Sequence, residues 1–331
     1  MRSSLNERAE ASGDAVAEPE IERGSFAPPG ARLARAPDRL VVATFNIRYA
    51  VGSFLITGSL FRRVGIRRPG RRPSLVAGNV ERAARAFTEG ELMPPADLVA
   101  LQEADRGTVR AGGRHVALEL ARAMRWHYAH ASMRKPKDEP PKSKQWWLDF
   151  EEPLRMNEEG ETGVALLGRA QMSEVERVEL PWFECAWRPR LALAATLALG
   201  SGSVRVFNSH IDPHAKVEGQ LAQHAAILAR AEEHAGEPVV LLGDFNTLTP
   251  ESRMATCRFL EEHGYTSPIP TGTPTWRAGL YRLHADWIFV RGLRVVRWGV
   301  ARPLSVSDHW PVWAEIELER TEGAETQRTE A

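Results

Sequence analysis

Short apolar runs that end in polar residues recur along this chain, and this pattern limits the folds that are open to it. Residues 40–45, 98–101 and 239–242 have the length and composition of buried strands. Polar residues follow each run directly, where a strand passes into a loop. Loops held by a rigid scaffold are the usual place for binding and catalysis. The chain is therefore expected to assemble one site from several strand ends.

Strand-like and helical segments alternate over most of the sequence. The runs that predict strands are residues 40–45, 98–101, 164–167, 191–199, 204–208, 239–242, 287–290 and 312–316. Apolar residues at helical spacing predict helices within residues 80–87, 115–124 and 220–234. Thr249 followed by Pro250 is typical of a helix start. The alternation predicts a mixed α/β fold.

The 331 residues are long enough for a large single α/β domain, which we expect to span residues 39–318. Residues 1–38 and 319–331 have low hydrophobicity and are expected to be disordered. Two segments, near residues 50–74 and 132–161, are interpreted as insertions. The first contains six arginines between Arg62 and Arg72, and the second contains Trp146 and Trp147. These charged segments are either solvated surface or a rim that grips the substrate.

The composition excludes several classes of protein. Lys plus Arg and Asp plus Glu both total 43, so the whole chain offers no long-range attraction to polyanions. Two cysteines, Cys185 and Cys257, are too few for a disulfide framework or a structural zinc site. No signal-like apolar segment is present, and residues 49–61 fall short of the ~20 residues that a membrane-spanning helix needs. A cytoplasmic monomer is therefore expected.

Some of the strand-end residues are the oxygen donors that a hard divalent metal requires. Glu103 offers a carboxylate to Mg²⁺ or Mn²⁺, ions that prefer oxygen ligands and keep several waters. Asn46 offers an amide oxygen or a hydrogen bond beside Glu103, although an Asn after a strand is also a common turn former. Asp308 is assigned to the metal or to a second ion position. The predicted metal ligands are thus Asn46, Glu103 and Asp308.

The remaining polar residues fit the acid–base chemistry of ester hydrolysis. Asp244 and Asn246 are two positions apart, so in extended geometry both project to one face. Asp244 can then accept a proton from an attacking water, while the amide of Asn246 holds water or phosphate. An Asx-rich turn is the alternative for this pair.

Two histidines follow other apolar runs. His309 can donate to a phosphoryl oxygen, and Asp286 is the candidate carboxylate that would fix its tautomer. His210 could protonate the leaving oxygen or contact the phosphate, and a structural role is the alternative. The predicted catalytic residues are His210, Asp244, Asn246, Asp286 and His309.

In order along the chain, these motifs resemble the endonuclease/exonuclease/phosphatase (DNase I-like) superfamily. The resemblance runs through ATFNIRY, DLVALQEADRG, GVALLGR, VRVFNSHID, VVLLGDFNTLTP, HADWIFVRGL and SDHWPVWAEI. It implies a four-layer α-β-β-α sandwich of two mostly antiparallel sheets flanked by helices. It also implies that Asn46 and Glu103 lie on the metal side, Asp244 and Asn246 activate water, and His309 with Asp286 binds phosphate.

The chain departs from the superfamily's usual motifs at four positions, Ser209, Ile211, Val164 and Trp287, and none of these departures removes a reactive group. His210 matches the nuclease, sphingomyelinase and phosphatase branches and argues against abasic-site repair. The resemblance implies a divalent-metal phosphodiesterase or nuclease that uses one-step in-line attack of water. A phosphatase or phospholipase-type hydrolase of a lipid or inositol phosphate is the alternative, and a non-catalytic binding module is the alternative of another class. A nucleic acid, a phospholipid and a phosphorylated metabolite all stay open as substrates.

Overall fold

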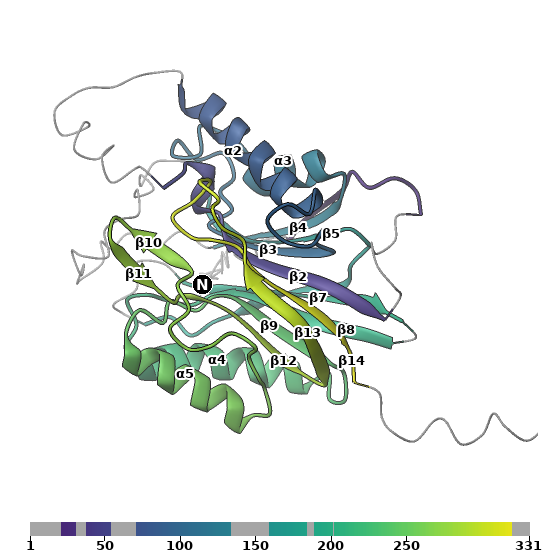
Figure 1. The fold of residues 1–331 in the computed structure, drawn as a ribbon, viewed down its shortest axis with the longest axis vertical. Coiled ribbons are helices and arrows are strands. Elements are labelled where there is room, and N and C mark those ends of the chain that lie inside the picture. Colours follow the sequence, from purple (N-terminus) through teal and green to yellow (C-terminus); the bar gives the residue numbers. More distant parts are fainter. Residues whose placement is uncertain are drawn as a thin grey trace, which may run out of the picture.

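The computed structural model describes residues 21–30, 38–53, 71–133, 159–183, 189–200 and 202–319. Two β-sheets stack face to face, and a pair of helices covers the outer side of each sheet (Figure 1). The fold is therefore the four-layer α-β-β-α sandwich that the resemblance implies.

Among the described residues, the first sheet has seven strands, and only one neighbouring pair is parallel. In order across the sheet the strands are β1 (Glu22–Ser25), β4 (His127–Ser132), β5 (Gly163–Gly168), β3 (Leu98–Gln102), β2 (Arg39–Asn46), β14 (Val312–Leu318) and β13 (Leu293–Val300). Strands β2 and β3 are the parallel pair, and their register sets Asn46 opposite Gln102. The carboxyl ends of both strands therefore lie at one edge of the sheet.

The second sheet brings three more site segments to an edge. Its strands, in order, are β12 (Asp286–Arg291), β9 (Val239–Asp244), β8 (Gly202–His210), β7 (Leu191–Leu199) and β6 (Ser173–Glu179). The parallel pair β8 and β9 sets His210 opposite Asp244. Strand β12 runs antiparallel to β9 and begins with Asp286, also opposite Asp244. Register alone thus places three of the predicted catalytic side chains together.

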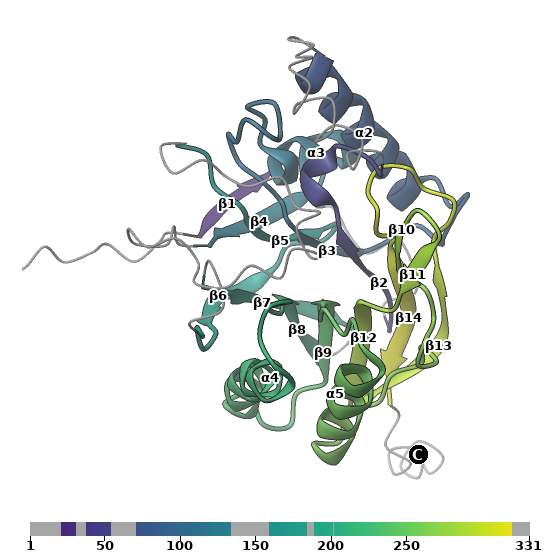
Figure 2. The ribbon, with the colours of Figure 1, turned by 90° about the vertical axis from the view of Figure 1, so that its left-hand side faces the viewer.

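Helices α2 (Arg71–Thr88) and α3 (Val116–Met124) cover the first sheet, and α4 (Val217–Glu232) and α5 (Pro250–Glu262) cover the second (Figure 2). The period-two alternation of the strands sorts their side chains between the layers. On β2, Leu40 and Val42 pack between the sheets, whereas Val41, Ala43 and Phe45 pack under α2 and α3. Strands buried on both faces read as continuous apolar runs, which explains the runs in the sequence.

Two small elements lie outside the sheets. The η1 turn (Arg48–Ala50) follows β2 directly. Strands β10 (Trp276–Ala278) and β11 (Tyr281–Leu283) form a separate hairpin at the side of the sandwich (Figure 2). No helix within the described ranges combines the length and the apolar character needed to cross a membrane.

The structure corrects two of the predicted boundaries. Residues 22–25, placed in a disordered flank, form β1, because backbone pairing with β4 and the contacts of Glu22 hold this short polar segment to the sheet. Arg71 and Arg72, placed in an arginine-rich loop, begin α2, and the guanidinium of Arg72 donates to the carbonyl of Arg110 at 3.1 Å. The rest of that loop, Trp146, Trp147 and Cys185 lie outside the described residues.

Candidate active site

All eight predicted site residues lie at one edge of the two stacked sheets. Asn46 ends β2 and Glu103 follows β3, while His210 and Asp244 end β8 and β9. Asn246 follows β9, Asp286 begins β12, and Asp308 and His309 precede β14.

Asp244 is the centre of this group. Its side chain is buried, and its Oδ2 atom accepts from Nδ2 of Asn46 at 2.9 Å. Nε2 of His210 and Nε2 of His309 lie 3.6 Å and 3.8 Å from the same oxygen. The other oxygen, Oδ1, accepts from the backbone N–H of Asn246 at 3.0 Å. Asp244 therefore joins residues from both sheets.

Gly243 makes this arrangement possible. It has φ +150°, and a Cβ atom there would lie 2.0 Å from the carbonyl oxygen of Ser209 on β8. Only glycine permits such a close approach of two backbones. The glycine thus lets β8 and β9 pair up to the residues that carry His210 and Asp244.

Asn46 joins two carboxylates on the side of the site where a metal ion is predicted. Its Nδ2 atom donates to Glu103 Oε1 and to Asp244 Oδ2, both at 2.9 Å, so two carboxylates flank one amide nitrogen. Its Oδ1 atom accepts from the backbone N–H of Arg48 at 3.0 Å, which sets the orientation of the amide. In this structure Asn46 faces the carboxylates as a donor, and its role as an oxygen ligand stays a prediction.

A hard divalent cation fits the donor set around Asn46. Glu103 and Asp244 offer carboxylate oxygens, which Mg²⁺ and Mn²⁺ prefer. Burial raises the pKa of Asp244 to about 6, the positive charge of His309 opposes this shift, and the negative charge of Asp286 adds to it. A cation bound beside Asp244 would relieve the cost of these crowded negative charges.

Asp308 faces a positive charge. Its Oδ2 atom lies 2.9 Å from a guanidinium nitrogen of Arg48 and accepts from the indole N–H of Trp276 at 3.1 Å. Both Arg48 and Asp308 are buried, so this ion pair is shielded from water. The structure thus assigns Asp308 an orienting contact, and its predicted role at a metal stays a prediction.

His309 is held by Asp286. Its Nδ1 atom lies 2.8 Å from Asp286 Oδ2, and both side chains are buried. Burial lowers the pKa of His309, but the negative charges of Asp286 and Asp244 outweigh burial and raise this pKa to about 10. The imidazole is therefore charged at neutral pH, with Nδ1 donating to Asp286 and Nε2 toward Asp244.

His210 contacts a cation, whereas His309 contacts a carboxylate. Its Nδ1 atom lies 3.2 Å from a guanidinium nitrogen of Arg190, and both residues are buried. Sequence reasoning did not single out Arg190, because an arginine at the start of a strand carries no signal of its own. Arg48 was also missed, because an arginine in a short turn carries no signal either, although it stands two residues after Asn46.

Several residues at the site adopt left-handed backbone conformations. Arg48, Glu103 and Asn246 have φ values of 44°, 51° and 49°. This conformation costs a non-glycine residue on the order of 1–2 kcal/mol. Such strain collects at functional sites, where the surrounding structure holds it in place.

A cavity of about 540 Å³ opens beside these residues. Glu103, Asp244 and His309 lie on its polar side. The β10–β11 hairpin supplies an apolar side, because its register places Trp276 opposite Leu283 and Ala278 opposite Tyr281 on one face; all four residues line the cavity. The site thus joins a cluster of polar residues to an apolar wall.

The opposite face of the hairpin is basic and turned away from the cavity. Arg277 and Arg282 lie 5.1 Å and 6.0 Å from the ring centre of Trp310. The backbone N–H of Arg277 donates to the carbonyl of Asp308 at 2.9 Å, which anchors the hairpin to the loop of His309.

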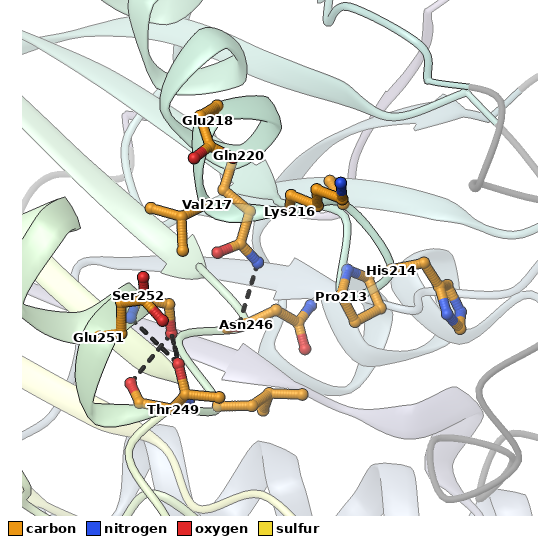
Figure 3. Close-up of a pocket in the computed structure, with 12 residues that line it drawn as sticks. Pro213, His214, Lys216, Val217, Glu218, Gln220, Asn246, Thr249, Glu251 and Ser252 are labelled. Atoms are coloured by element: carbon orange, nitrogen blue, oxygen red, sulfur yellow. Dashed lines mark hydrogen bonds between the residues drawn. The ribbon is translucent and has the colours of Figure 1, made fainter.

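A second cavity of about 400 Å³ adjoins the first, between the starts of α4 and α5 (Figure 3). The two share Pro213, His214, Asn246, Leu248 and Thr249. In Figure 3 the amide of Gln220 on α4 donates to the backbone carbonyl of Asn246 at 3.2 Å. The loop that follows Asp244 therefore separates the two cavities and is tied to α4.

A further group of potential metal ligands, Glu22, His115 and His130, lies near β1. The carboxylate of Glu22 already accepts from Tyr128 at 2.7 Å and from Arg106 at 2.8 Å, and His115 Nε2 lies 3.0 Å away. Because Arg106 neutralises Glu22, this group acts as an anchor for β1.

Comparisons with known proteins agree with this geometry. The model of the Endonuclease/Exonuclease/phosphatase family matches residues 43–309, and no curated protein sequence matches the chain. An endonuclease/exonuclease/phosphatase from Beutenbergia cavernae is similar in structure, with a TM-score of 0.55, 19% identity, and coverage of 85% of this chain and 72% of that one.

Two of the similar structures are named as phosphatases. A mannosyl-6-phosphatase from Bacteroides thetaiotaomicron has a TM-score of 0.53 and 16% identity, covering 84% of this chain and 99% of its own. ANGEL2, a 2',3'-cyclic phosphatase, has a TM-score of 0.56 and 16% identity, covering 91% of this chain and 99% of its own. At these identities the likeness concerns the fold.

Proposed function

Because the chain belongs to the endonuclease/exonuclease/phosphatase family, we propose that it is a Mg²⁺- or Mn²⁺-dependent hydrolase of phosphoric esters that uses direct attack of water. The observation that carries this proposal is the position of Asp244. On one side, the amide of Asn46 links its carboxylate to that of Glu103, and on the other side lie the imidazoles of His210 and His309. A base between a cation site and a charged donor is what in-line hydrolysis requires.

The residues around Asp244 would have separate roles in this reaction. Asp244 takes a proton from the attacking water, and the backbone N–H of Asn246 fixes the orientation of its carboxylate. Charged His309 faces the same point and donates to a phosphoryl or leaving oxygen. Glu103, with Asn46 and Asp308 as further predicted ligands, would hold a Mg²⁺ or Mn²⁺ ion, which supplies positive charge at the phosphoryl oxygens.

The apolar wall of the hairpin supports a substrate with an apolar or planar group next to its phosphate. Trp276, Tyr281 and Leu283 line the cavity, and Tyr281 is 77% exposed and open to a ligand. A nucleobase, an aryl group or a lipid would gain from contact with this wall. An inositol phosphate is polar around its whole ring and gains less from it.

A hydrolysis screen tests the proposal. Purified protein with Mg²⁺ is assayed on bis(p-nitrophenyl) phosphate, single- and double-stranded DNA, RNA, sphingomyelin and inositol phosphates, with EDTA and His309→Ala as controls. Cleavage that disappears in both controls is expected. Cleavage that persists in EDTA would contradict the proposed metal dependence. Absence of cleavage on every substrate would favour a binding module.

Metal binding can be measured without a substrate. Mg²⁺ is expected to raise the melting temperature of the wild type, because it binds only the folded state. Glu103→Gln should lose most of this rise, whereas Glu179→Gln, at an exposed position, should keep it. An equal rise in both variants would place the ion elsewhere.

A further inference from the structure

The contact between Arg190 and His210 determines which ring nitrogen of the histidine carries the proton. A guanidinium nitrogen of Arg190 lies 3.2 Å from Nδ1 of His210. Arginine is always protonated in proteins and has donors only. Nδ1 of His210 must therefore be the acceptor of this hydrogen bond and carries no proton.

The only proton left to His210 is on Nε2, which faces the reaction centre. Nε2 lies 3.6 Å from Asp244 Oδ2, and His210 lines the catalytic cavity. An imidazole whose Nδ1 accepts a hydrogen bond holds its Nε2 proton, because releasing that proton would leave an imidazolate anion. His210 is thus suited to donate a hydrogen bond but not to transfer its proton.

Arg190 is itself placed for this contact. Its side chain is buried at 4% exposure, and within the described ranges no carboxylate lies close enough to form an ion pair with it. Among the same residues its Nε atom has no hydrogen-bond partner, and its other near contact is the sulfur of Met133 at 4.0 Å. A buried guanidinium is costly to retain, so its orientation toward His210 is a constraint that the fold maintains.

We propose that Arg190 is a positioning residue that locks His210 in the Nε2–H tautomer, so that His210 serves as a neutral hydrogen-bond donor to a phosphoryl oxygen. The two imidazoles beside Asp244 then differ in role, since His309 is oriented by a carboxylate and His210 by a guanidinium. The tautomer itself does not depend on turnover, but the role of His210 toward phosphate rests on the proposed function.

The tautomer can be read directly in metal-free protein with ¹⁵N-labelled histidine. Two-bond correlations between ring protons and ring nitrogens distinguish a protonated nitrogen from an unprotonated one, and His210→Gln identifies the signal. At neutral pH we expect Nδ1 of His210 to be unprotonated and Nε2 protonated. A proton on Nδ1 in the wild type would overturn the proposal.

Variants of Arg190 test the cause. Arg190→Lys keeps a donor and should keep the tautomer, whereas Arg190→Glu supplies an acceptor and should move a proton onto Nδ1. Arg205→Met is the matched control, because Arg205 is equally buried and lies on the same strand as His210 but contacts Glu176 instead. It should lower the melting temperature and leave the His210 signals unchanged.

Kinetics then connect the tautomer to the reaction. Arg190→Glu should lower kcat on the order of 10²-fold, as expected for loss of one preorganised donor, and Arg190→Lys should restore much of it. Unchanged tautomer and kcat in Arg190→Glu would contradict the positioning role. A locked tautomer in a protein that hydrolyses nothing would instead refute the proposed function alone.

Discussion

At the scale of single residues, the charge of His309 depends on Asp286. Burial alone would keep this imidazole neutral, and the neighbouring negative charges raise its pKa to about 10. We predict that Asp286→Asn lowers the pKa of His309 substantially, toward its usual value of about 6.5. An NMR titration of the histidine ring protons in metal-free protein measures this change, and a pKa that stays near 10 would contradict it.

The same pKa shift has a consequence for stability. Because the pKa of His309 is higher in the folded protein than in the unfolded chain, its contribution to stability is complete below about pH 6.5. The contribution is lost as the pH rises toward 10. The wild type should therefore lose more stability over this range than His309→Gln does.

Gly243 offers a second prediction at this scale. In Gly243→Ala, the new methyl group would collide with the Ser209 carbonyl, so β8 and β9 must separate near His210 and Asp244. We expect a loss of roughly 1–3 kcal/mol in the free energy of unfolding, together with a large fall in turnover. Urea unfolding and kcat measure the two effects.

Gly78→Ala is the matched control, because Gly78 lies in α2 with open space around its Cα. Alanine is the better helix former, so this variant should be neutral or more stable. Equal losses in both glycine variants would show that the close approach at Ser209 is not the cause.

At the scale of elements, strand β1 is held to its neighbours by the contacts of Glu22 with Tyr128 and Arg106. Burial raises the pKa of Glu22, but hydrogen bonds from Tyr128 and Arg106 outweigh burial and lower this pKa to about 2. A carboxyl whose pKa is lower in the folded protein stabilises it above about pH 4.5 and loses that effect as the pH falls to 2.

Glu22→Gln should therefore lower the melting temperature at neutral pH and flatten its decline between pH 4.5 and 2. Differential scanning calorimetry of both proteins across this range measures the difference. Hydrogen exchange at the β1–β4 backbone amides should quicken in the variant. A difference in melting temperature that does not change with pH would show that Glu22 acts through packing alone.

At the scale of the whole molecule, side chains from both sheets pack into one core, so we expect the two sheets to unfold together. Leu193 on β7 is fully buried in this core. Leu193→Ala should cost about 2–5 kcal/mol of unfolding free energy, as expected for a large-to-small change in a core. Leu75→Ala on α2, where the leucine is 42% exposed, should cost far less.

Urea unfolding followed by tryptophan fluorescence and circular dichroism measures both variants. The two probes should give one shared transition, because neither sheet can keep its inner face buried without the other. Separate transitions would show that the sheets unfold independently.

Local patterns in the chain predicted the alternating strands and helices and the polar strand ends, whereas the four-layer arrangement was implied by the family resemblance. Strands buried on both faces produce long apolar runs, so residues 191–199 and 239–242 read as strands without any tertiary information. The Thr249–Pro250 start of α5 is also a local signal, confirmed by its capping contacts with Ser252. The polar residues that follow apolar runs pointed to Asp244, Asn46 and Glu103. Their side chains meet because the parallel pairs β2–β3 and β8–β9 bring these strand ends to one edge.

The sequence predicted the contact between Asp286 and His309, but tertiary structure alone placed the two arginines of the site. Arg190 and Arg48 look like ordinary surface arginines in the sequence, and only packing places them against His210 and Asp308. Strand β1 is short and polar, so only its pairing with β4 makes it a strand. Local propensity acts over a few residues, whereas pKa values, tautomers and ion pairs depend on neighbours far along the chain, which the fold alone brings within reach.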